Sequence, residues 1–248
     1  MTTVDANLQA VRVRISRAAA AAGRDPAAVA LLAVSKTHPA TLLEQAVRAG
    51  QRAFGENYVE EALQKMEALA ALLGSAAPVI EWHLIGPLQS NKTRVVAERF
   101  QWVQSLDREK IARRLSEQRP PGLAPMDVLL QVNVSGEATK SGLDPREVLA
   151  LARAVAPLPR LRLRGLMAIP EPSDDVALQR ARFRVVRELF ERLRSEGLAL
   201  DTLSMGMSGD LEAAIAEGAT MVRVGTAIFG ARATDRGGRV ANTEKAAT

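Results

Sequence analysis

The sequence contains no cysteine, only two histidines and 3% aromatic residues. Without cysteine the chain can form no disulfide and can use no thiolate as a nucleophile or metal ligand. Neither histidine has other ligand-type residues at a suitable spacing, so we expect no metal site. No apolar stretch approaches the roughly 20 residues of a membrane-spanning helix, and the N-terminal segment lacks the apolar core of a secretory signal. We therefore expect a cytoplasmic protein without a membrane partner.

The abundant residues are aliphatic and charged. Hydrophobic residues make up 47% of the 248-residue chain and charged residues 25%, as in ordinary globular proteins. The formal net charge is +5, which raises the question of nucleic-acid binding. The arginines, however, are interspersed with acidic residues, as in RARFRVVRELFERLRSE, and no aromatic RNA-binding motif or zinc-finger spacing occurs. We expect no nucleic-acid partner and keep a basic binding module only as a minor alternative.

Short β-rich runs alternate along the chain with longer segments of helical periodicity. The predicted strands are Leu31–Lys36, Ala53–Tyr58, Glu81–Gly86, Trp102–Asp107, Asp127–Val134, Leu161–Ile169, Thr202–Ser208 and Met221–Thr226. The predicted helices between them are Ala40–Ala49, Val59–Leu73, Ser90–Glu98, Arg108–Glu117, Pro145–Ala156, Asp174–Ser195 and Asp210–Glu217. A further helix, Asp5–Ala22, precedes the first strand.

Strands that alternate with helices favour a parallel sheet. Eight such units in about 230 residues match the size of a (β/α)8 barrel, roughly 250 residues. An open doubly wound sheet is the alternative, but the segment AVSKTHPA lacks the glycine-rich turn typical of that fold. The sequence therefore predicts an α/β fold, a single (β/α)8 TIM-type barrel with an extra N-terminal helix. We expect one domain over residues 1–232 and a flexible tail over 233–248.

Lys36 ends the first predicted strand, in the run LLAVSK. Barrel active sites lie at the carboxyl ends of the strands, and a lysine buried there is costly unless it is paired or neutral. A neutral lysine is what Schiff-base formation requires. Lys36 is therefore a candidate imine-forming residue, and a lysine whose amine reaches out to solvent is the alternative.

Arg223 lies in the last predicted strand, MVRVGT. The two valines of this run share one face of the strand, so the arginine shares the other face, which we expect to point into the barrel. An inward arginine needs a partner such as a carboxylate, a ring nitrogen or a phosphate. A structural ion pair remains the alternative.

Small polar residues follow the last two predicted strands. Ser208-Gly209 follows the seventh strand and Gly225-Thr226 the eighth. Barrels frequently build phosphate sites from these two loops. Glycine lets backbone N–H groups approach a phosphate, and Ser and Thr add hydroxyl donors. Either pair alone is also explained by ordinary turn chemistry.

The two histidines are weaker candidates. His83 follows Trp82 in the third predicted strand, and either a structural role or a contact with a ligand ring fits it. His38 lies two residues after Lys36, and we expect it to be a solvated loop residue. The loop Gly136–Gly142 is expected to be a mobile rim of the barrel.

Six segments of the chain resemble one known family, the pyridoxal phosphate homeostasis proteins (the YggS/PROSC group). These segments are AVSKTHP, FGENYVEEALQK, EWHLIGPLQSNK, NVSGEATKSGL, GLMAIP and LSMGMSGDLEAAIAEGATMVRVGTAIFG, which together extend from about Leu31 to Arg232. The resemblance implies a single barrel similar to the N-terminal domain of alanine racemase. It also implies that pyridoxal 5′-phosphate (PLP) is held as a Schiff base, an internal aldimine, on Lys36.

The resemblance also implies roles for further residues. It places Arg223 beside the pyridine nitrogen and Ser208, Gly225 and Thr226 around the phosphate. The other expected pocket walls are Asn57, His83, Met205 and Gly206.

An arginine at the ring nitrogen has a chemical consequence. It stays protonated, so the pyridine nitrogen stays neutral and the ring is a poorer electron sink. Racemisation also needs an acid–base group on each face of the substrate carbon. Racemases of this type bring a tyrosine from a second domain, whereas the only tyrosine here, Tyr58, falls on the second predicted strand, and the barrel pattern ends near Gly230.

The expected function is therefore PLP homeostasis by storage, buffering or delivery, without efficient turnover and without catalytic residues. We expect a monomer whose recipients are PLP-dependent apoenzymes. A weak PLP-dependent racemase or decarboxylase is the first alternative, and a cofactor-free Schiff-base aldolase on the same barrel is the second.

Overall fold

The computed structural model describes residues 3–134 and 141–231. The tail predicted over 233–248 and most of the loop predicted at Gly136–Gly142 lie outside the described residues, so these two predictions stay predictions.

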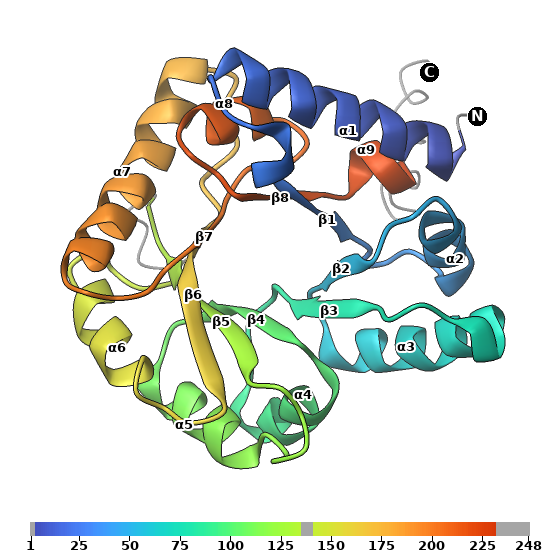
Figure 1. The fold of residues 1–248 in the computed structure, drawn as a ribbon, viewed down its shortest axis with the longest axis horizontal. Coiled ribbons are helices and arrows are strands. Elements are labelled where there is room, and N and C mark those ends of the chain that lie inside the picture. Colours follow the sequence, from blue (N-terminus) through green and yellow to red (C-terminus); the bar gives the residue numbers. More distant parts are fainter. Residues whose placement is uncertain (1–2, 135–140, 232–248) are drawn as a thin grey trace, which may run out of the picture.

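Eight parallel strands close into a barrel in which each strand pairs with its neighbours in chain order (Figure 1). The strands are β1 Ala30–Val34, β2 Ala53–Glu56, β3 Glu81–Leu84, β4 Trp102–Leu106, β5 Met126–Val132, β6 Leu161–Ala168, β7 Thr202–Ser204 and β8 Met221–Val224. The helices are α1 Val4–Ala21, α2 Ala40–Arg48, α3 Val59–Leu73, α4 Thr93–Arg99, α5 Glu109–Gln118, α6 Val148–Val155, α7 Val176–Ser195, α8 Leu211–Ala216 and α9 Thr226–Phe229. This arrangement confirms the predicted α/β barrel.

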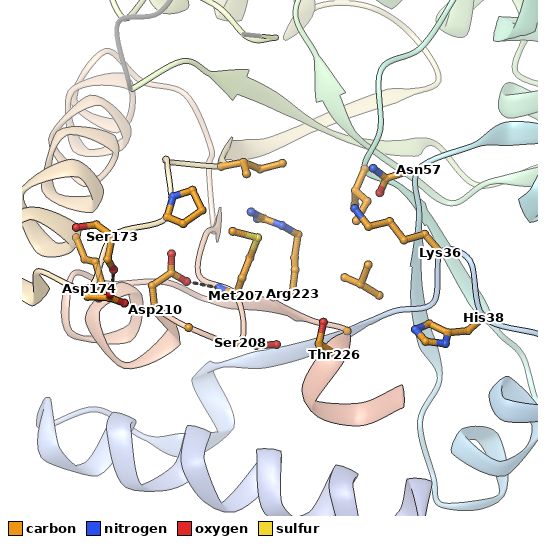
Figure 2. A pocket seen from close by; sticks show the side chains of 17 residues that line it. Lys36, His38, Asn57, Ser173, Asp174, Met207, Ser208, Asp210, Arg223 and Thr226 are labelled. Atoms are coloured by element: carbon orange, nitrogen blue, oxygen red, sulfur yellow. Dashed lines mark hydrogen bonds between the residues drawn. The ribbon is translucent and has the colours of Figure 1, made fainter. Parts of the chain in front are cut away.

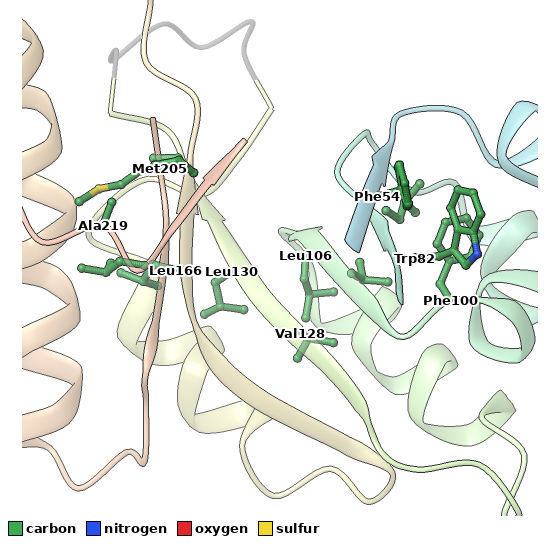
Figure 3. Close-up of a cluster of buried hydrophobic side chains, with 14 of the residues drawn as sticks. Phe54, Trp82, Phe100, Leu106, Val128, Leu130, Leu166, Met205 and Ala219 are labelled. Atoms are coloured by element: carbon green, nitrogen blue, oxygen red, sulfur yellow. The ribbon is translucent and has the colours of Figure 1, made fainter. Parts of the chain in front are cut away.

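The alternation of side chains along each strand separates two apolar regions. Outward side chains such as Phe54, Trp82 and Val128 pack against the surrounding helices and form the main core, part of which Figure 3 shows. Inward side chains form two smaller clusters inside the barrel. One contains Leu32, Val34, Ile85 and Met221, and the other Trp102, Leu129 and Met167. The barrel is therefore a packed interior with its free space at one end.

Ion pairs gather at the amino-terminal end of the barrel. Asp127 of β5 accepts two hydrogen bonds from Arg162, at 2.5 and 2.8 Å, and one from Arg164 at 3.1 Å. Arg164 also pairs with Asp201 at 2.7 Å and lies 5.1 Å from the ring centre of Trp102. Because these ion pairs fill the amino-terminal end, space for a ligand is expected at the opposite, carboxyl-terminal end.

The extra N-terminal helix is confirmed as α1. Its buried residues recur every three or four positions, which is the spacing of one helical face: Val4, Leu8, Val11, Ile15 and Ala19. This face packs against α2, α8 and α9 (Figure 1). Thr3 caps the helix, since its hydroxyl accepts the backbone N–H of Ala6 at 3.2 Å. α1 thus covers the side of the barrel where the first and last strands meet.

Several predicted strands were too long at their carboxyl ends. β1 ends at Val34 rather than Lys36, and β8 ends at Val224, after which the unpredicted helix α9 begins at Thr226. β2 ends at Glu56, so Tyr58 is not on a strand; it precedes α3 with 59% of its surface exposed. The physical reason is the same in each case. The chain leaves the hydrogen-bond ladder of the sheet early and places polar groups around the carboxyl-terminal end of the barrel.

We predict that Gly165→Ala destabilises the barrel by about 3 kcal/mol, since a side chain has no room there. Gly165 of β6 pairs with Thr202 of β7, and a Cβ atom would lie 1.9 Å from the Thr202 carbonyl oxygen. Urea unfolding midpoints would measure the effect. The control is Gly122→Ala, because a Cβ at Gly122 meets nothing within 4 Å. Equal midpoints for the two variants would contradict the prediction.

Candidate functional site

A cavity of about 370 Å³ opens at the carboxyl-terminal end of the barrel (Figure 2). It contains six of the nine residues predicted for the site. These are Lys36, Asn57, Ser208, Arg223, Gly225 and Thr226, which come from the ends of β1, β2, β7 and β8. Residues that lie far apart in the sequence are therefore brought to one place by the closure of the barrel.

Lys36 projects into the cavity from a turn that directly follows β1 (Figure 2). The next residue, Thr37, has φ 65°, which is rare for a β-branched residue and costs energy. Two contacts hold this strained turn. The Thr37 N–H donates to Glu61 Oε1 at 2.5 Å, and its hydroxyl donates to the Lys36 carbonyl oxygen at 2.6 Å. The backbone position of Lys36 is thus held by its neighbour.

A buried ionic cluster lies behind this turn, on the outer face of β1 and β2. The Lys65 amine contacts Glu56 at 2.8 Å, Glu61 at 2.6 Å and the Ser35 carbonyl oxygen at 2.5 Å. The Ser35 hydroxyl donates to Glu56 at 2.6 Å. Burial raises the pKa of Glu56, and Lys65 opposes that shift. The cluster joins β1, β2 and α3, and through Glu61 it holds the turn that carries the candidate nucleophile.

Arg223 enters the cavity from β8, with only 2% of its surface exposed. Its Nη1 donates to the carbonyl oxygen of Ser204 at 2.6 Å and to the Ser204 hydroxyl at 2.8 Å. Its Nη2 donates to the Ala168 carbonyl oxygen at 2.7 Å. Burial lowers the pKa of Arg223 to about 10, so it remains a cation at neutral pH. The predicted inward orientation is confirmed, whereas its hydrogen-bond partners are neutral groups rather than a carboxylate or a phosphate.

Two loops supply hydroxyl and backbone groups to the cavity. Ser208 and Gly209 lie in the β7–α8 loop, in which Asp210 accepts the Met207 N–H at 2.6 Å. Arg14 of α1 donates to the Ser208 carbonyl oxygen at 3.1 Å, so the extra helix supports this loop. The second pair, Gly225 and Thr226, stands where β8 passes into α9. The loops predicted to bind a phosphate therefore face the same space as Lys36.

His83 does not line the cavity. It is completely buried in the barrel interior, its ring stacked on Trp102 at 5.0 Å and hydrogen-bonded to Glu81 and Gln104. Burial lowers its pKa, while the hydrogen bond that the ring donates to Glu81 and the charges of Glu81 and Asp127 oppose that shift. The sequence placed His83 in the third strand but did not reveal how deep in the barrel it lies.

Met205 and Gly206 also lie outside the cavity lining. Met205 is buried in the main core between strands and helices (Figure 3). Gly206 has φ 96°, and a Cβ there would lie 2.6 Å from the Ala214 Cβ, so the position requires glycine. Its carbonyl oxygen accepts the Arg223 N–H at 2.9 Å. Gly206 therefore supports the site through the backbone that carries Arg223.

Sequence reasoning missed several cavity residues. The expectation of a solvated His38 is wrong, because His38 is 8% exposed, lines the cavity and lies 5.2 Å from the Phe229 ring. The other unpredicted lining residues are Val34, Ile85, Ile169, Pro172, Ser173, Asp174, Gln179, Met207 and Asp210. Strand alternation was the available signal for Val34 and Ile85, since they lie two positions beyond inward residues.

The donors around the cavity fit a flat, anionic carbonyl compound. Lys36 offers an amine, Arg223 offers N–H donors, and the two loops offer hydroxyl and backbone groups. The Asn57 Oδ1 atom is buried and has no hydrogen-bond partner in the structure, so a ligand donor would satisfy it. Within residues 3–134 and 141–231, no group of three or more acidic or histidine residues could hold a metal ion.

Comparison with known proteins places the barrel in a class. Residues 6–233 match the family model of the alanine racemase N-terminal domain. Alanine racemase from Corynebacterium glutamicum superposes with a TM-score of 0.65 at 18% identity, covering 91% of this chain and 61% of that one, which shows a common fold. The chain is thus a barrel of the alanine racemase N-terminal class. No helix among the described residues has the length and apolar character to cross a membrane.

Closer relatives define the family. The pyridoxal phosphate homeostasis protein of Pseudomonas aeruginosa is 62% identical over 94% of this chain and 97% of its own length, and that of Escherichia coli is 53% identical over 94% and 98%. PipY of Synechococcus elongatus, solved with PLP bound, is 37% identical with a TM-score of 0.79, over 92% of this chain and 100% of that chain. The chain belongs to the pyridoxal phosphate homeostasis protein family.

We predict that His83 makes folding stability depend on pH below about 6.5, the ordinary pKa of histidine. Because the folded-state pKa is lowered, only the unfolded chain takes up this proton as the pH falls through that value. Stability should fall by up to about 1.4 kcal/mol per pH unit. Urea unfolding between pH 7.5 and 5.5 would show this slope in the wild type and in His38→Gln. The slope should be weaker in His83→Gln, and an unchanged slope there would refute the prediction.

Proposed function

We propose that the chain binds PLP in the barrel cavity as a Schiff base on Lys36 and serves PLP homeostasis by storing, buffering or delivering it. The observation that carries the proposal is the position of the Lys36 amine in one cavity with the buried Arg223 cation and the two hydroxyl-bearing loops. Membership of the family and the PLP-bound structure of PipY support the same cofactor.

The cofactor supplies an aldehyde that condenses with a neutral amine and releases one water molecule. Lys36 has to present its nitrogen unprotonated and correctly aimed for this reaction. The Thr37 turn and the ionic cluster of Glu56, Glu61 and Lys65 provide the aim. Hydrolysis returns the aldehyde and the amine, so the link is reversible, as a carrier requires.

The phosphate is assigned to the β7–α8 and β8–α9 loops. Ser208 and Thr226 can donate hydroxyl hydrogens, and Gly209 and Gly225 expose backbone at the same cavity wall. Each charge-assisted hydrogen bond of this kind contributes about 1.5–3 kcal/mol. Asn57 is assigned to a ligand donor on the Lys36 side of the cavity, because its Oδ1 is buried without a partner.

Arg223 is assigned to the ring nitrogen. With a pKa of about 10, it donates a hydrogen bond at neutral pH and gives up no proton, so the ring nitrogen stays neutral. A neutral ring withdraws electrons from a bound amino acid less well than a pyridinium does. Tyr58 lies exposed outside the cavity lining, so it provides no acid–base group there. These two features support a carrier without efficient turnover.

One observation favours a second candidate, a weak PLP-dependent racemase or decarboxylase. His38 lines the cavity two residues after Lys36, and an imidazole is the commonest general acid–base group. We keep the carrier as the first proposal, acting as a monomer that supplies PLP-dependent apoenzymes.

We predict that purified wild-type protein with PLP is yellow, that borohydride bleaches it, and that peptide mapping finds the reduced cofactor on Lys36. Lys36→Ala should lose the band and the trapped adduct, because it lacks the amine. The matched control is Lys110→Ala, whose exposed lysine lies on α5. A wild type that stays colourless with added PLP would exclude the proposal and favour the cofactor-free aldolase.

We also predict that the loaded protein restores activity to a PLP-dependent apoenzyme while exchanging the Cα hydrogen of amino acids at least 10⁴-fold more slowly than the turnover of about 10 s⁻¹ typical of enzymes. Deuterium incorporation measured by NMR would give the exchange rate. Faster exchange in the wild type that is lost in His38→Ala would establish the enzyme alternative instead.

A further inference from the structure

A chain of hydrogen bonds crosses the barrel interior from the cavity to the opposite end. The Ser204 hydroxyl accepts from Arg223 at 2.8 Å and donates to Gln104 Oε1 at 2.7 Å. Gln104 Nε2 lies 2.9 Å from His83 Nδ1, and His83 Nε2 lies 2.8 Å from Glu81 Oε1. Arg223 lines the cavity, whereas the four remaining members lie outside the cavity lining. We call these five residues the axial chain.

The orientation of the Gln104 amide gives the axial chain one direction. Its oxygen accepts the Ser204 hydroxyl hydrogen, and its Nε2 contacts both His83 Nδ1 and the sulfur of Met221 at 3.2 Å. A thioether sulfur only accepts hydrogen bonds. Turning the amide over would place its oxygen against that sulfur and its N–H groups against Ser204. Met221 therefore holds the amide with its oxygen toward Ser204.

The amide direction fixes the proton of His83. Since Gln104 donates to Nδ1, that nitrogen carries a lone pair, and the ring hydrogen is on Nε2, where it is donated to Glu81. An imidazolium would set an N–H of the ring against the N–H of the amide. Burial at 0% exposure also disfavours the charged ring. His83 is thus a neutral imidazole with a single defined tautomer.

The axial chain connects the buried cation of Arg223 to a carboxylate that it does not contact directly. No described carboxylate forms an ion pair with Arg223, although a guanidinium so deeply buried ordinarily has one. Each member of the chain turns its acceptor atom toward Arg223 and its donor toward Glu81. The aligned dipoles end on the Glu81 carboxylate, whose pKa the hydrogen bond from His83 lowers. One negative charge is therefore placed at the far end of a polarised path, while the charge of Asp210, which lines the same cavity, acts on Arg223 without a direct ion pair.

We propose that His83 and Gln104 are positioning residues that hold the Arg223 guanidinium in place through Ser204. Binding of a ligand at the cavity end of the axial chain therefore changes the environment of the His83 ring. The part of this inference that concerns PLP rests on the proposed function, whereas the tautomer of His83 is a property of the protein without ligand. A passive space-filling role for His83 predicts neither a fixed tautomer nor a response to the cavity.

The first test uses the protein without PLP, labelled with ¹⁵N in histidine. With two histidines in the chain, the spectrum contains two imidazoles, and His38→Gln assigns them. We expect His83 to be a neutral ring with its hydrogen on Nε2, and to show no titration between pH 5.5 and 8.5. A ring that titrates near 6.5, or one that carries its hydrogen on Nδ1, overturns the proposal whether or not PLP binds.

The second test measures the response to the cavity. Loading the wild type with PLP, monitored by its absorption band, should shift the ¹⁵N signal of His83 Nδ1. Ser204→Ala removes the hydroxyl that joins Arg223 to Gln104, and we expect it to bind PLP but to lose that shift. The matched control is Ser116→Ala on α5, because Ser116 is also buried and donates to a carbonyl oxygen, that of Pro159. A His83 shift of wild-type size in Ser204→Ala would overturn the proposal.

A third variant keeps the proposal testable if Ser204→Ala does not fold. Gln104→Glu places an acceptor in front of His83 Nδ1, so that nitrogen should gain a hydrogen and its ¹⁵N signal should move to the protonated range. An unchanged Nδ1 signal in a folded Gln104→Glu variant would contradict the proposed role of the axial chain. If instead no protein variant or wild type shows a PLP band, the proposed function fails while the tautomer result still decides the axial chain.

Discussion

The enclosure of one cation, the Arg223 guanidinium, is the constraint on which the site depends. Removing such a charge from water costs several kcal/mol, and the cost is offset only when its N–H groups find acceptors in good geometry. Two of those acceptors are the carbonyl oxygens of Ala168 and Ser204, at the carboxyl ends of β6 and β7. The cation is therefore satisfied only when β6, β7 and β8 are correctly paired, and completing the barrel also completes the site.

The opposite wall of the cavity is organised by a different principle. There the ionic cluster around Lys65 lies outside the barrel, behind the turn that carries Lys36, and Glu61 extends it to the strained Thr37. On one wall, neutral carbonyl and hydroxyl groups inside the barrel hold the charged Arg223. On the other wall, charged groups outside the barrel hold the turn that carries Lys36. The first arrangement holds a side chain that lines the cavity and the second holds the backbone of the turn, and both preorganise the site.

The sequence predicted the barrel because periodicity and turn signals are local, and it placed Arg223 inward because alternation along a strand is strict. It also identified the residues at the strand ends that gather at the cavity, such as Lys36 and Thr226. The sequence could not show how deep in the barrel each inward side chain lies. His83 and Ile85 point inward two residues apart, yet only Ile85 reaches the cavity, because Ile85 follows the last residue of β3 and His83 lies deeper within the strand. His38 is buried against Phe229 of α9, and a helix of only four residues is too short for its periodicity to be recognised in the sequence.

The distribution of basic side chains has a consequence for chemoselectivity. Most ion pairs of the described residues are made by arginine, as at the buried Glu217, which contacts three arginines. A guanidinium stays protonated and does not condense with an aldehyde as an amine does. Of the lysines in the described residues other than Lys36, Lys65 is held between two carboxylates, Lys92 pairs with Glu60, and Lys110 is exposed on α5. Within the described residues, the proposed carrier of a reactive aldehyde therefore presents few rival amines, which favours capture at Lys36 inside the barrel.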